Sequence, residues 1–290
     1  MAPPATSANE PLQERLLKLA QKEEERALIH TKTLQFAWFV GHVTLLLTTL
    51  RYSLSYVFLN YYSRWAQFSY RTAFLAAAAT YGIVVFKGYR ARAKAGKQPS
   101  SPLALAGDEN VQYLAMALIW LWSRQYPLAL LPYAVYSVFH VLTYTRGILL
   151  PVLQPQPAAA AGQKPAGGLA DTIGGFVKNY YDASMSIVAA LELALWFRIF
   201  AYAIFFVKGS WIILLAYTIF LRARISQSTF VQGMIRQLGA RGDALTQRQD
   251  VPPVARQAWE TAKNVLKTVH DQTDVSRYIQ GGAQPAKKAQ

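Results

Sequence analysis

The chain has 290 residues, with 30 Lys and Arg against 15 Asp and Glu, and 53% of it is hydrophobic. A formal charge of +15 suits a nucleic-acid binder, but basic loops beside apolar segments explain the excess without one, because anionic membrane leaflets attract such loops. Cysteine is absent, which excludes disulfides, thiolate metal sites, a cysteine nucleophile, prenylation and palmitoylation.

Residues 1–33 are predicted to form a cytosolic N-terminal segment with a polar helix. Residues 1–11 have neither the basic nor the apolar region of a cleaved signal peptide, so the first apolar run should direct insertion itself. Residues 12–33 carry charges of both signs, which is typical of a solvated helix face.

Six apolar runs follow, at Leu34–Leu50, Phe68–Phe86, Val111–Trp122, Pro127–Thr143, Ile187–Val207 and Trp211–Leu221. A helix needs about 20 apolar residues to cross the roughly 30 Å hydrocarbon core. The first, second, fourth and fifth runs can therefore cross, whereas the third and sixth either borrow flanking residues or insert shallowly. Aromatic residues after the first run, from Tyr52 to Tyr70, are expected to lie in the headgroup zone.

Very short links join the third run to the fourth, at residues 123–126, and the fifth to the sixth, at residues 208–210. Links of this length indicate antiparallel helical hairpins. The predicted fold is therefore all-α: a polytopic helical membrane protein built from antiparallel hairpins. Four apolar helices fall within residues 34–150, and a further membrane hairpin lies at residues 184–221.

Basic residues alternate between the two sides of the membrane if all six runs cross. With the N-terminus in the cytosol, the cytosolic segments up to Arg241 hold 17 Lys and Arg, against 4 on the opposite side. Cytosolic loops carry the excess of Lys and Arg in membrane proteins. Both termini are therefore expected in the cytosol.

The polar residues inside the apolar runs that we single out are Arg71, His140, Glu192 and Arg198. A charge at the bilayer centre costs about 2.5–3.5 kcal/mol on insertion scales, so each should have a partner. Glu192 and Arg198 are six residues apart, which is roughly 240° and 9 Å on a helix, so they should not pair. We expect Glu192 to meet Arg71 or His140. The charges then either clamp helices together or lie near headgroups in a shallow hairpin, in preference to forming a proton or substrate path.

Residues 151–183 are predicted to be a flexible Pro/Ala/Gly linker followed by a pre-membrane segment. The four histidines are too scattered for an HExxH zinc site, and the chain has no P-loop and no GxSxG elbow. The sequence therefore predicts no enzyme, no cofactor and no metal site. Two glycine pairs, Gly174–Gly175 and Gly281–Gly282, are interpreted as turns.

Residues 222–290 are predicted to form a basic, cytosolic tail, in which residues 254–270 show helical periodicity. One arc of this amphipathic helix is apolar and includes a tryptophan, and basic residues border it, as in helices that lie in the membrane interface. The alternative is an ordinary helix packed on a partner or on loops of the same chain. The predicted interface residues are Val254, Ala258, Trp259, Ala262, Val265, Leu266 and Val269, with Arg256, Lys263 and Lys267 beside them.

The last four residues include Lys287 and Lys288, at the fourth and third positions from the end. This spacing resembles the dilysine retrieval signal of endoplasmic reticulum membrane proteins, which a receptor reads on a cytosolic tail. The expected cytosolic position of the tail agrees with this interpretation.

Three segments carry a family resemblance. Asp108–Leu150 contains Tyr113, Tyr126–Pro127, Ser137, His140 and the run Thr143–Arg146, and two further matches are Ala190–Leu195, with Glu192, and Tyr217–Leu238. Together they resemble the transmembrane protein 33 family, which includes fungal pore membrane and endoplasmic-reticulum-shaping proteins. The resemblance implies a polytopic protein of the endoplasmic reticulum and nuclear envelope, associated with reticulon-type shaping proteins and nuclear pore components.

We therefore expect a non-enzymatic protein that shapes or organises endoplasmic reticulum and nuclear envelope membrane, including nuclear pore complexes. Its expected partners are a bilayer with anionic lipids and the proteins that the resemblance implies. Nucleic acid is not an expected partner, and the sequence does not decide whether the chain forms a homo-oligomer. One alternative is a small transporter or lipid-handling protein in which Glu192, Arg198 and His140 line a polar cavity. Another is an adaptor that recruits soluble partners through its tails.

Overall fold

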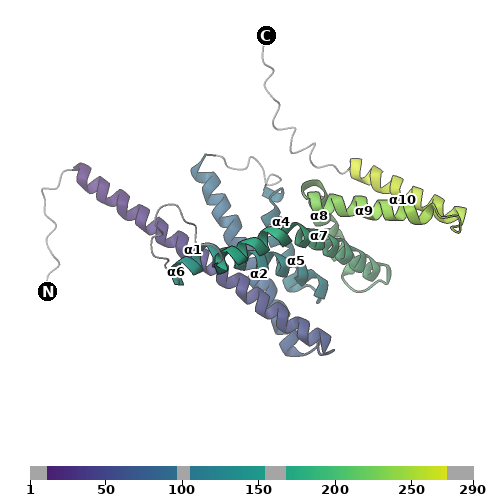
Figure 1. The fold of residues 1–290 in the computed structure, drawn as a ribbon, viewed down its shortest axis with the longest axis horizontal. Coiled ribbons are helices and arrows are strands. Elements are labelled where there is room, and N and C mark those ends of the chain that lie inside the picture. Colours follow the sequence, from purple (N-terminus) through teal and green to yellow (C-terminus); the bar gives the residue numbers. More distant parts are fainter. Residues whose placement is uncertain (1–11, 97–104, 154–167, 273–290) are drawn as a thin grey trace, which may run out of the picture.

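The computed structural model describes residues 12–96, 105–153 and 168–272, and these residues form helices joined by turns (Figure 1). The all-α fold class is confirmed for them. The helices in chain order are α1 (Leu12–Val57), α2 (Arg64–Lys94), α4 (Glu109–Trp122), α5 (Pro127–Tyr144), the π-helical turn η1 (Thr145–Leu149), α6 (Leu150–Leu153), α7 (Leu169–Ile204), α8 (Ser210–Gln227), α9 (Thr229–Thr246) and α10 (Pro253–Gln272).

Four helical segments are long and apolar enough to cross a membrane: Lys32–Val57, Arg64–Lys94, Pro127–Leu153 and Leu169–Ile204. They contain the first, second and fourth apolar runs and all but the last three residues of the fifth. The other two runs lie in α4, with 14 residues, and α8, with 18. At 1.5 Å per residue, α4 is about 21 Å long and α8 about 27 Å, both shorter than the hydrocarbon core.

Small residues allow α1 and α2 to pack closely. Ala73, Ala76 and Ala77 of α2 are buried. A Cβ atom at Gly41 of α1 would lie only 2.5 Å from the Thr80 side-chain methyl of α2. Membrane helices lack a hydrophobic driving force between them, so such small residues favour association by letting the backbones approach.

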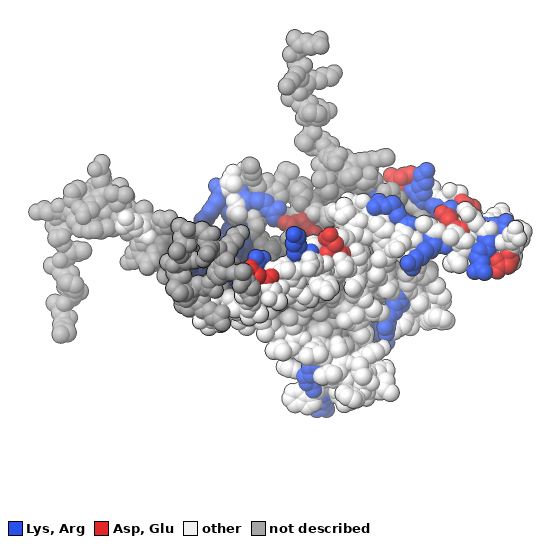
Figure 2. All heavy atoms as spheres, in the orientation of Figure 1, with Lys and Arg blue, Asp and Glu red and all other residues white. Residues whose placement is uncertain are grey.

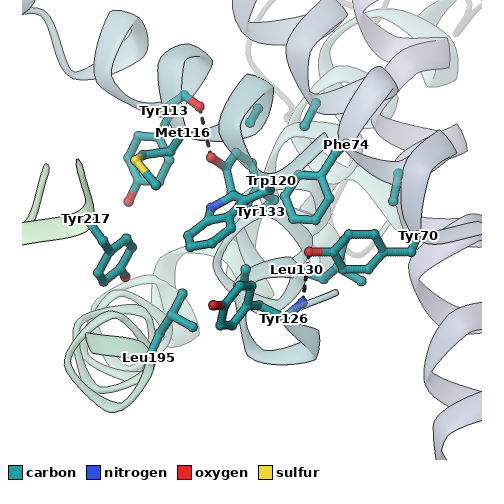
Figure 3. Packing of buried hydrophobic residues seen from close by; sticks show 14 of the residues in the cluster. Tyr70, Phe74, Tyr113, Met116, Trp120, Tyr126, Leu130, Tyr133, Leu195 and Tyr217 are labelled. Atoms are coloured by element: carbon teal, nitrogen blue, oxygen red, sulfur yellow. Dashed lines mark hydrogen bonds between the residues drawn. The ribbon is translucent and has the colours of Figure 1, made fainter. Parts of the chain in front are cut away.

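Aromatic side chains fill the middle of the bundle (Figure 3). Trp120 and Tyr113 of α4 lie next to Tyr133 of α5 and Tyr217 of α8, and all four are buried. The Tyr133 hydroxyl donates a 2.9 Å hydrogen bond to the Tyr113 carbonyl oxygen, which satisfies the phenol inside the core. The tyrosines therefore join α4, α5 and α8 through both ring packing and hydrogen bonds.

Two aromatic residues expected to anchor the chain in the headgroup zone are buried between helices instead. Tyr52 and Tyr70 are buried, with their ring centroids 5.2 Å apart. Tyr62, on the turn between α1 and α2, and Trp65, at the start of α2, are by contrast exposed. The prediction for Tyr52 and Tyr70 was wrong because composition alone does not show that their helices pack against each other on that side.

Six helices have one end in the same region of the molecule, which we call the turn end: the turns at residues 58–63, 123–126 and 205–209, with the adjoining helix ends. Side chains link the three turns. The Tyr52 hydroxyl donates to Gln125 Oε1 at 3.2 Å, and the Tyr126 backbone N–H donates to the Tyr70 hydroxyl at 3.0 Å. The Tyr126 and Tyr202 ring centroids are 5.9 Å apart.

Residues 169–183, which were expected to lie in a linker and pre-membrane segment with a turn at Gly174–Gly175, are helical. Residues 169–183 form the first part of α7, and Gly174 and Gly175 lie inside this helix, so their interpretation as a turn was wrong. The Arg146 guanidinium, presented by η1, lies directly against Gly174, where a Cβ atom would collide with it. Gly174 therefore permits a close helix contact. Gly281–Gly282 lie outside the described residues.

Candidate functional site

A buried polar network centres on Glu192 of α7, whose side chain is 1% exposed. Its carboxylate accepts hydrogen bonds from the Tyr113 hydroxyl and from Arg224 Nε, the latter at 3.3 Å. The Tyr217 hydroxyl donates to the Glu192 carbonyl oxygen at 3.1 Å. A buried carboxylate is tolerated only when it is paired and hydrogen-bonded, and Glu192 has both kinds of partner.

Arg224 is the central cation of the network and is only 3% exposed. It lies in the last turn of α8, which continues past the apolar run to Gln227. Besides Glu192 it contacts the Glu109 carboxylate, and its Nη2 lies 3.4 Å from the Tyr136 hydroxyl. Its Cζ is 5.3 Å from the Tyr113 ring centroid, a cation–π distance. Arg224 thus ties α4, α5, α7 and α8 together.

A cavity of about 450 Å³ lies beside this network. Its wall includes Glu109, Tyr136, His140, Tyr181 and Arg224, from α4, α5, α7 and α8. Glu109 is half-exposed, so this end of the network reaches solvent or headgroups while Glu192 does not. Within this wall Arg224 contacts both Glu109 and Tyr136, which favours a role in holding the helices together.

The expected partners of Glu192 were wrong. Arg71 lies in α2 and its Nη1 donates to the carbonyl oxygens of Trp120, at 3.1 Å, and Leu121. These carbonyls belong to the last turn of α4. The last carbonyl oxygens of a helix have no backbone N–H partner within that helix. Arg71 therefore caps α4 inside the bundle and does not neutralise Glu192.

His140 and Arg198 also lie apart from Glu192. The His140 ring packs on Trp38 and His42, with centroid distances of 4.9 and 4.7 Å. Arg198 lies near the turn end, where its Nη2 donates to the Tyr202 hydroxyl at 3.1 Å. The structure therefore contradicts the alternative in which Glu192, Arg198 and His140 line one polar cavity.

The pairing of His42 with Ser137 joins α1 to α5. His42 Nδ1 lies 2.9 Å from Ser137 Oγ, and Ser137 Oγ donates to the Tyr133 carbonyl oxygen at 2.7 Å. Because the hydroxyl has a single proton and gives it to Tyr133, His42 Nδ1 must be the donor to Ser137. Both side chains are buried, so this pair is a second polar contact between helices.

The predicted tail helix is present as α10 and packs against α9. The Trp259 indole lies directly against Gly242, and its Nε1 donates to Asp243 Oδ1 at 2.7 Å. Lys263 Nζ donates to the same oxygen at 2.6 Å. The hydrogen bond from Lys263, and to a smaller extent the one from Trp259, holds the pKa of Asp243 below its ordinary value.

The rest of the apolar arc of α10 has no partner among the described residues. Val254, Val265 and Leu266 are 76%, 56% and 67% exposed, and Ala258 and Ala262 are exposed as well. Trp259 and Lys263 therefore bind α9 from one border of the arc and leave its centre open. The side chain of Val269 and the pair Lys287–Lys288 lie outside the described residues.

Sequence reasoning missed Arg224, Tyr113, Tyr136 and Tyr217 as members of the network. Arg224 was counted as a cytosolic loop charge, because the apolar run ends at Leu221. One signal was available. The three segments that carried the family resemblance contain Tyr113, Glu192, Tyr217 and Arg224, and the structure brings all four together.

Comparisons with known proteins find a family model and relatives that match most of the chain. A family model described as transmembrane protein 33/nucleoporin POM33 matches residues 19–271. Nucleoporin POM33 of Chaetomium thermophilum is 49% identical over 301 residues, covering 100% of both chains. Tetra-spanning protein 1 of Schizosaccharomyces pombe is 34% identical over 84% of this chain and 86% of its own. The pore and endoplasmic reticulum protein of 33 kDa of Saccharomyces cerevisiae is 25% identical over 81% and 89%. No solved structure matches the chain.

Proposed function

The chain belongs to the transmembrane protein 33/nucleoporin POM33 family, whose members are non-enzymatic membrane proteins, and we propose that it organises endoplasmic reticulum and nuclear envelope membrane, including the membrane at nuclear pores. The names of its relatives, a nucleoporin and a pore and endoplasmic reticulum protein, carry this proposal. Reticulon-type shaping proteins and nuclear pore components are its proposed partners.

We infer that the protein shapes the bilayer through helical hairpins of unequal depth. The α4–α5 turn contacts Tyr70, which lies six residues after the start of α2. Six residues of helix rise about 9 Å, so the α4–α5 turn ends about 9 Å short of the α1–α2 turn. The α4–α5 turn also packs against the end of α7, because the Tyr126 and Tyr202 ring centroids are 5.9 Å apart and Tyr202 lies three residues before the α7–α8 turn. Hairpins that reach less deeply occupy more of the leaflet from which they enter, which would curve the membrane toward that side.

The proposed orientation places both termini in the cytosol. The charge asymmetry supports it, and so does the position of the turns, because α1 carries the chain from the N-terminal side to the turn end in one pass. The α9–α10 pair then lies on the side of the termini. The open apolar arc of α10, bordered by Arg256 and Lys267, is proposed to bind anionic membrane there.

Reconstitution tests the shaping function against the transport alternative. The purified protein is placed in liposomes of endoplasmic reticulum composition, and vesicle shape is recorded by electron microscopy together with flux of entrapped solute and lipid. We expect tubules without flux. Flux that Glu192→Gln abolishes, without tubules, would instead support transport.

The dilysine signal is tested in cells, separately from membrane shaping. We propose that a receptor reads Lys287 and Lys288, so changing both to Ser should move part of the protein to the Golgi. A matched control changes Arg277, another basic residue of the tail, to Ser, and should leave the distribution unchanged. An endoplasmic reticulum distribution that is the same in both variants would remove the retrieval function.

A further inference from the structure

The turn end is basic and has no carboxylate to balance its charge. Its cations are Arg51, Arg64, Arg124, Arg198 and Lys208, and the face shown in Figure 2 has blue but no red atoms at its lower end. The sequence explains this, because residues 26–107, 110–170 and 193–242 contain no Asp or Glu. Glu192, the acidic residue nearest in sequence to Arg198, is buried about 9 Å away along α7 and is paired with Arg224.

Two of these arginines converge on one tyrosine. Arg124 Cζ lies 5.3 Å, and Arg198 Cζ 5.6 Å, from the centroid of the Tyr202 ring. Arg198 also donates to the Tyr202 hydroxyl. Two guanidiniums held on one ring repel each other, and their stacking leaves several N–H donors free for an acceptor from outside the chain.

A buried hydroxyl without a partner lies next to this pair. Tyr126 is 0% exposed, and its hydroxyl has no hydrogen-bond partner among the described residues. Its ring packs 5.9 Å from Tyr202, and both arginine charges act on its hydroxyl. An unmade hydrogen bond of this kind is unfavourable, so a group that supplies an acceptor here would be favoured.

Exposed apolar side chains also lie at the turn end. Trp122, Phe205 and Phe206 are 84%, 78% and 82% exposed at the ends of the α4–α5 and α7–α8 turns. Such residues are stable in the boundary between acyl chains and headgroups. At that depth the anionic group at highest concentration is the phosphate of a phospholipid.

We propose that Arg124, Arg198 and Tyr126 form a binding site for the phosphate of a phospholipid headgroup, in the leaflet opposite the chain termini. The guanidiniums donate to the phosphate oxygens, and the Tyr126 hydroxyl donates once the lipid has entered. The site depends on the phosphate and not on the head alcohol, because no carboxylate is present to recognise an amine. This inference does not depend on the proposed shaping function.

Binding of short-chain lipids to the full-length protein in detergent tests the site. Dihexanoyl phosphatidic acid, dihexanoyl phosphatidylcholine, dihexanoylglycerol and inorganic phosphate are titrated separately by calorimetry. We expect both phospholipids to bind, and dihexanoylglycerol, which lacks the phosphate, to bind at least about 10-fold more weakly. Equal binding of dihexanoylglycerol would overturn the proposal. Inorganic phosphate that binds as tightly as the phospholipids would assign the site to free phosphate instead.

Variants locate the binding to this pair. Arg124→Gln and Arg198→Gln should each weaken phospholipid binding about 10-fold, because each removes a charged donor to the phosphate. The matched control is Arg90→Gln, since Arg90 makes a similar contact with Phe86, at 5.7 Å, far from the turn end. Equal losses in the control and in the two variants would refute the site.

Lysine variants keep the test open if the glutamine variants fail to fold. Arg124→Lys and Arg198→Lys preserve the charges but remove the planar fork that binds two phosphate oxygens. The double lysine variant should fold, as judged by thermal unfolding, and bind phospholipid several-fold more weakly than the unchanged protein. An unchanged affinity in that variant would contradict the proposal.

Discussion

The Glu192–Arg224 pair predicts an unequal response to removal of its two members. Replacing Arg224 with Gln leaves the Glu192 carboxylate buried, with the Tyr113 hydroxyl and no cation. Breaking a buried pair from one side costs about 3–5 kcal/mol, because an uncompensated charge remains. Glu192→Gln is milder, because its amide oxygen still accepts from Tyr113 and Arg224 keeps Glu109, so we expect a loss of about 0.6–2 kcal/mol.

Denaturant unfolding of the protein in nanodiscs measures both losses and their coupling. The double variant Glu192→Gln with Arg224→Gln has no buried charge left at this position, so it should be more stable than Arg224→Gln alone. Glu109→Gln is the control, since its half-exposed carboxylate should contribute less than about 1 kcal/mol. Additive losses in the double variant, or a larger loss for Glu192→Gln than for Arg224→Gln, would refute the clamp.

Four other outcomes are expected. Protease added to sealed microsomes should remove tags from both termini, and protection of either tag would contradict the orientation. A peptide of residues 250–274 should become helical on anionic vesicles, and Leu266→Asp should abolish this more completely than added salt does; a peptide that stays unstructured would favour recruitment of soluble partners. Gly41→Val should destabilise the α1–α2 contact by about 1–3 kcal/mol in unfolding experiments, because the side chain would collide with Thr80, whereas Gly82→Val, with open space around it, should cost less. The α9–α10 contact is fully present above the ordinary pKa of Asp and should be lost as the pH falls through the lowered pKa of Asp243, which Trp259 fluorescence would report; loss at a pH above that ordinary value would contradict the pairing.

The lengths of the apolar runs were predictable from the sequence, and the contacts between them were not. Hydropathy identified the four segments that can cross and the two that are short, because the length and the hydropathy of a segment depend only on its own residues. The partner of Glu192 depends instead on how far α8 continues beyond its apolar run. Arg224 lies three residues past Leu221, and only the packing of α8 against α7 turns it inward.

The same limit explains the errors on the aromatic residues and the glycines. Tyrosine suits both a headgroup zone and a buried contact with a hydrogen bond, so Tyr52 and Tyr70 could be assigned only after α1 and α2 were placed side by side. A glycine pair suits both a turn and a close helix contact. At Gly174 the deciding factor is Arg146, which approaches from a different part of the chain.

The position of the buried charges favours an architectural role over transport. A path across the bundle would have to connect the cavity beside Arg224 to the turn end. In the described residues that route is filled by Trp120, Tyr126, Tyr133 and Tyr217, all of which are buried. Glu192, the residue that a proton or substrate would need to reach, is 1% exposed and already has a cation and a phenol as partners. Opening such a route would break the contacts that hold α4, α5, α7 and α8 together. The charges are therefore best explained as the means by which α4 and α8 stay attached to α5 and α7, and the proposed membrane shaping depends on this attachment.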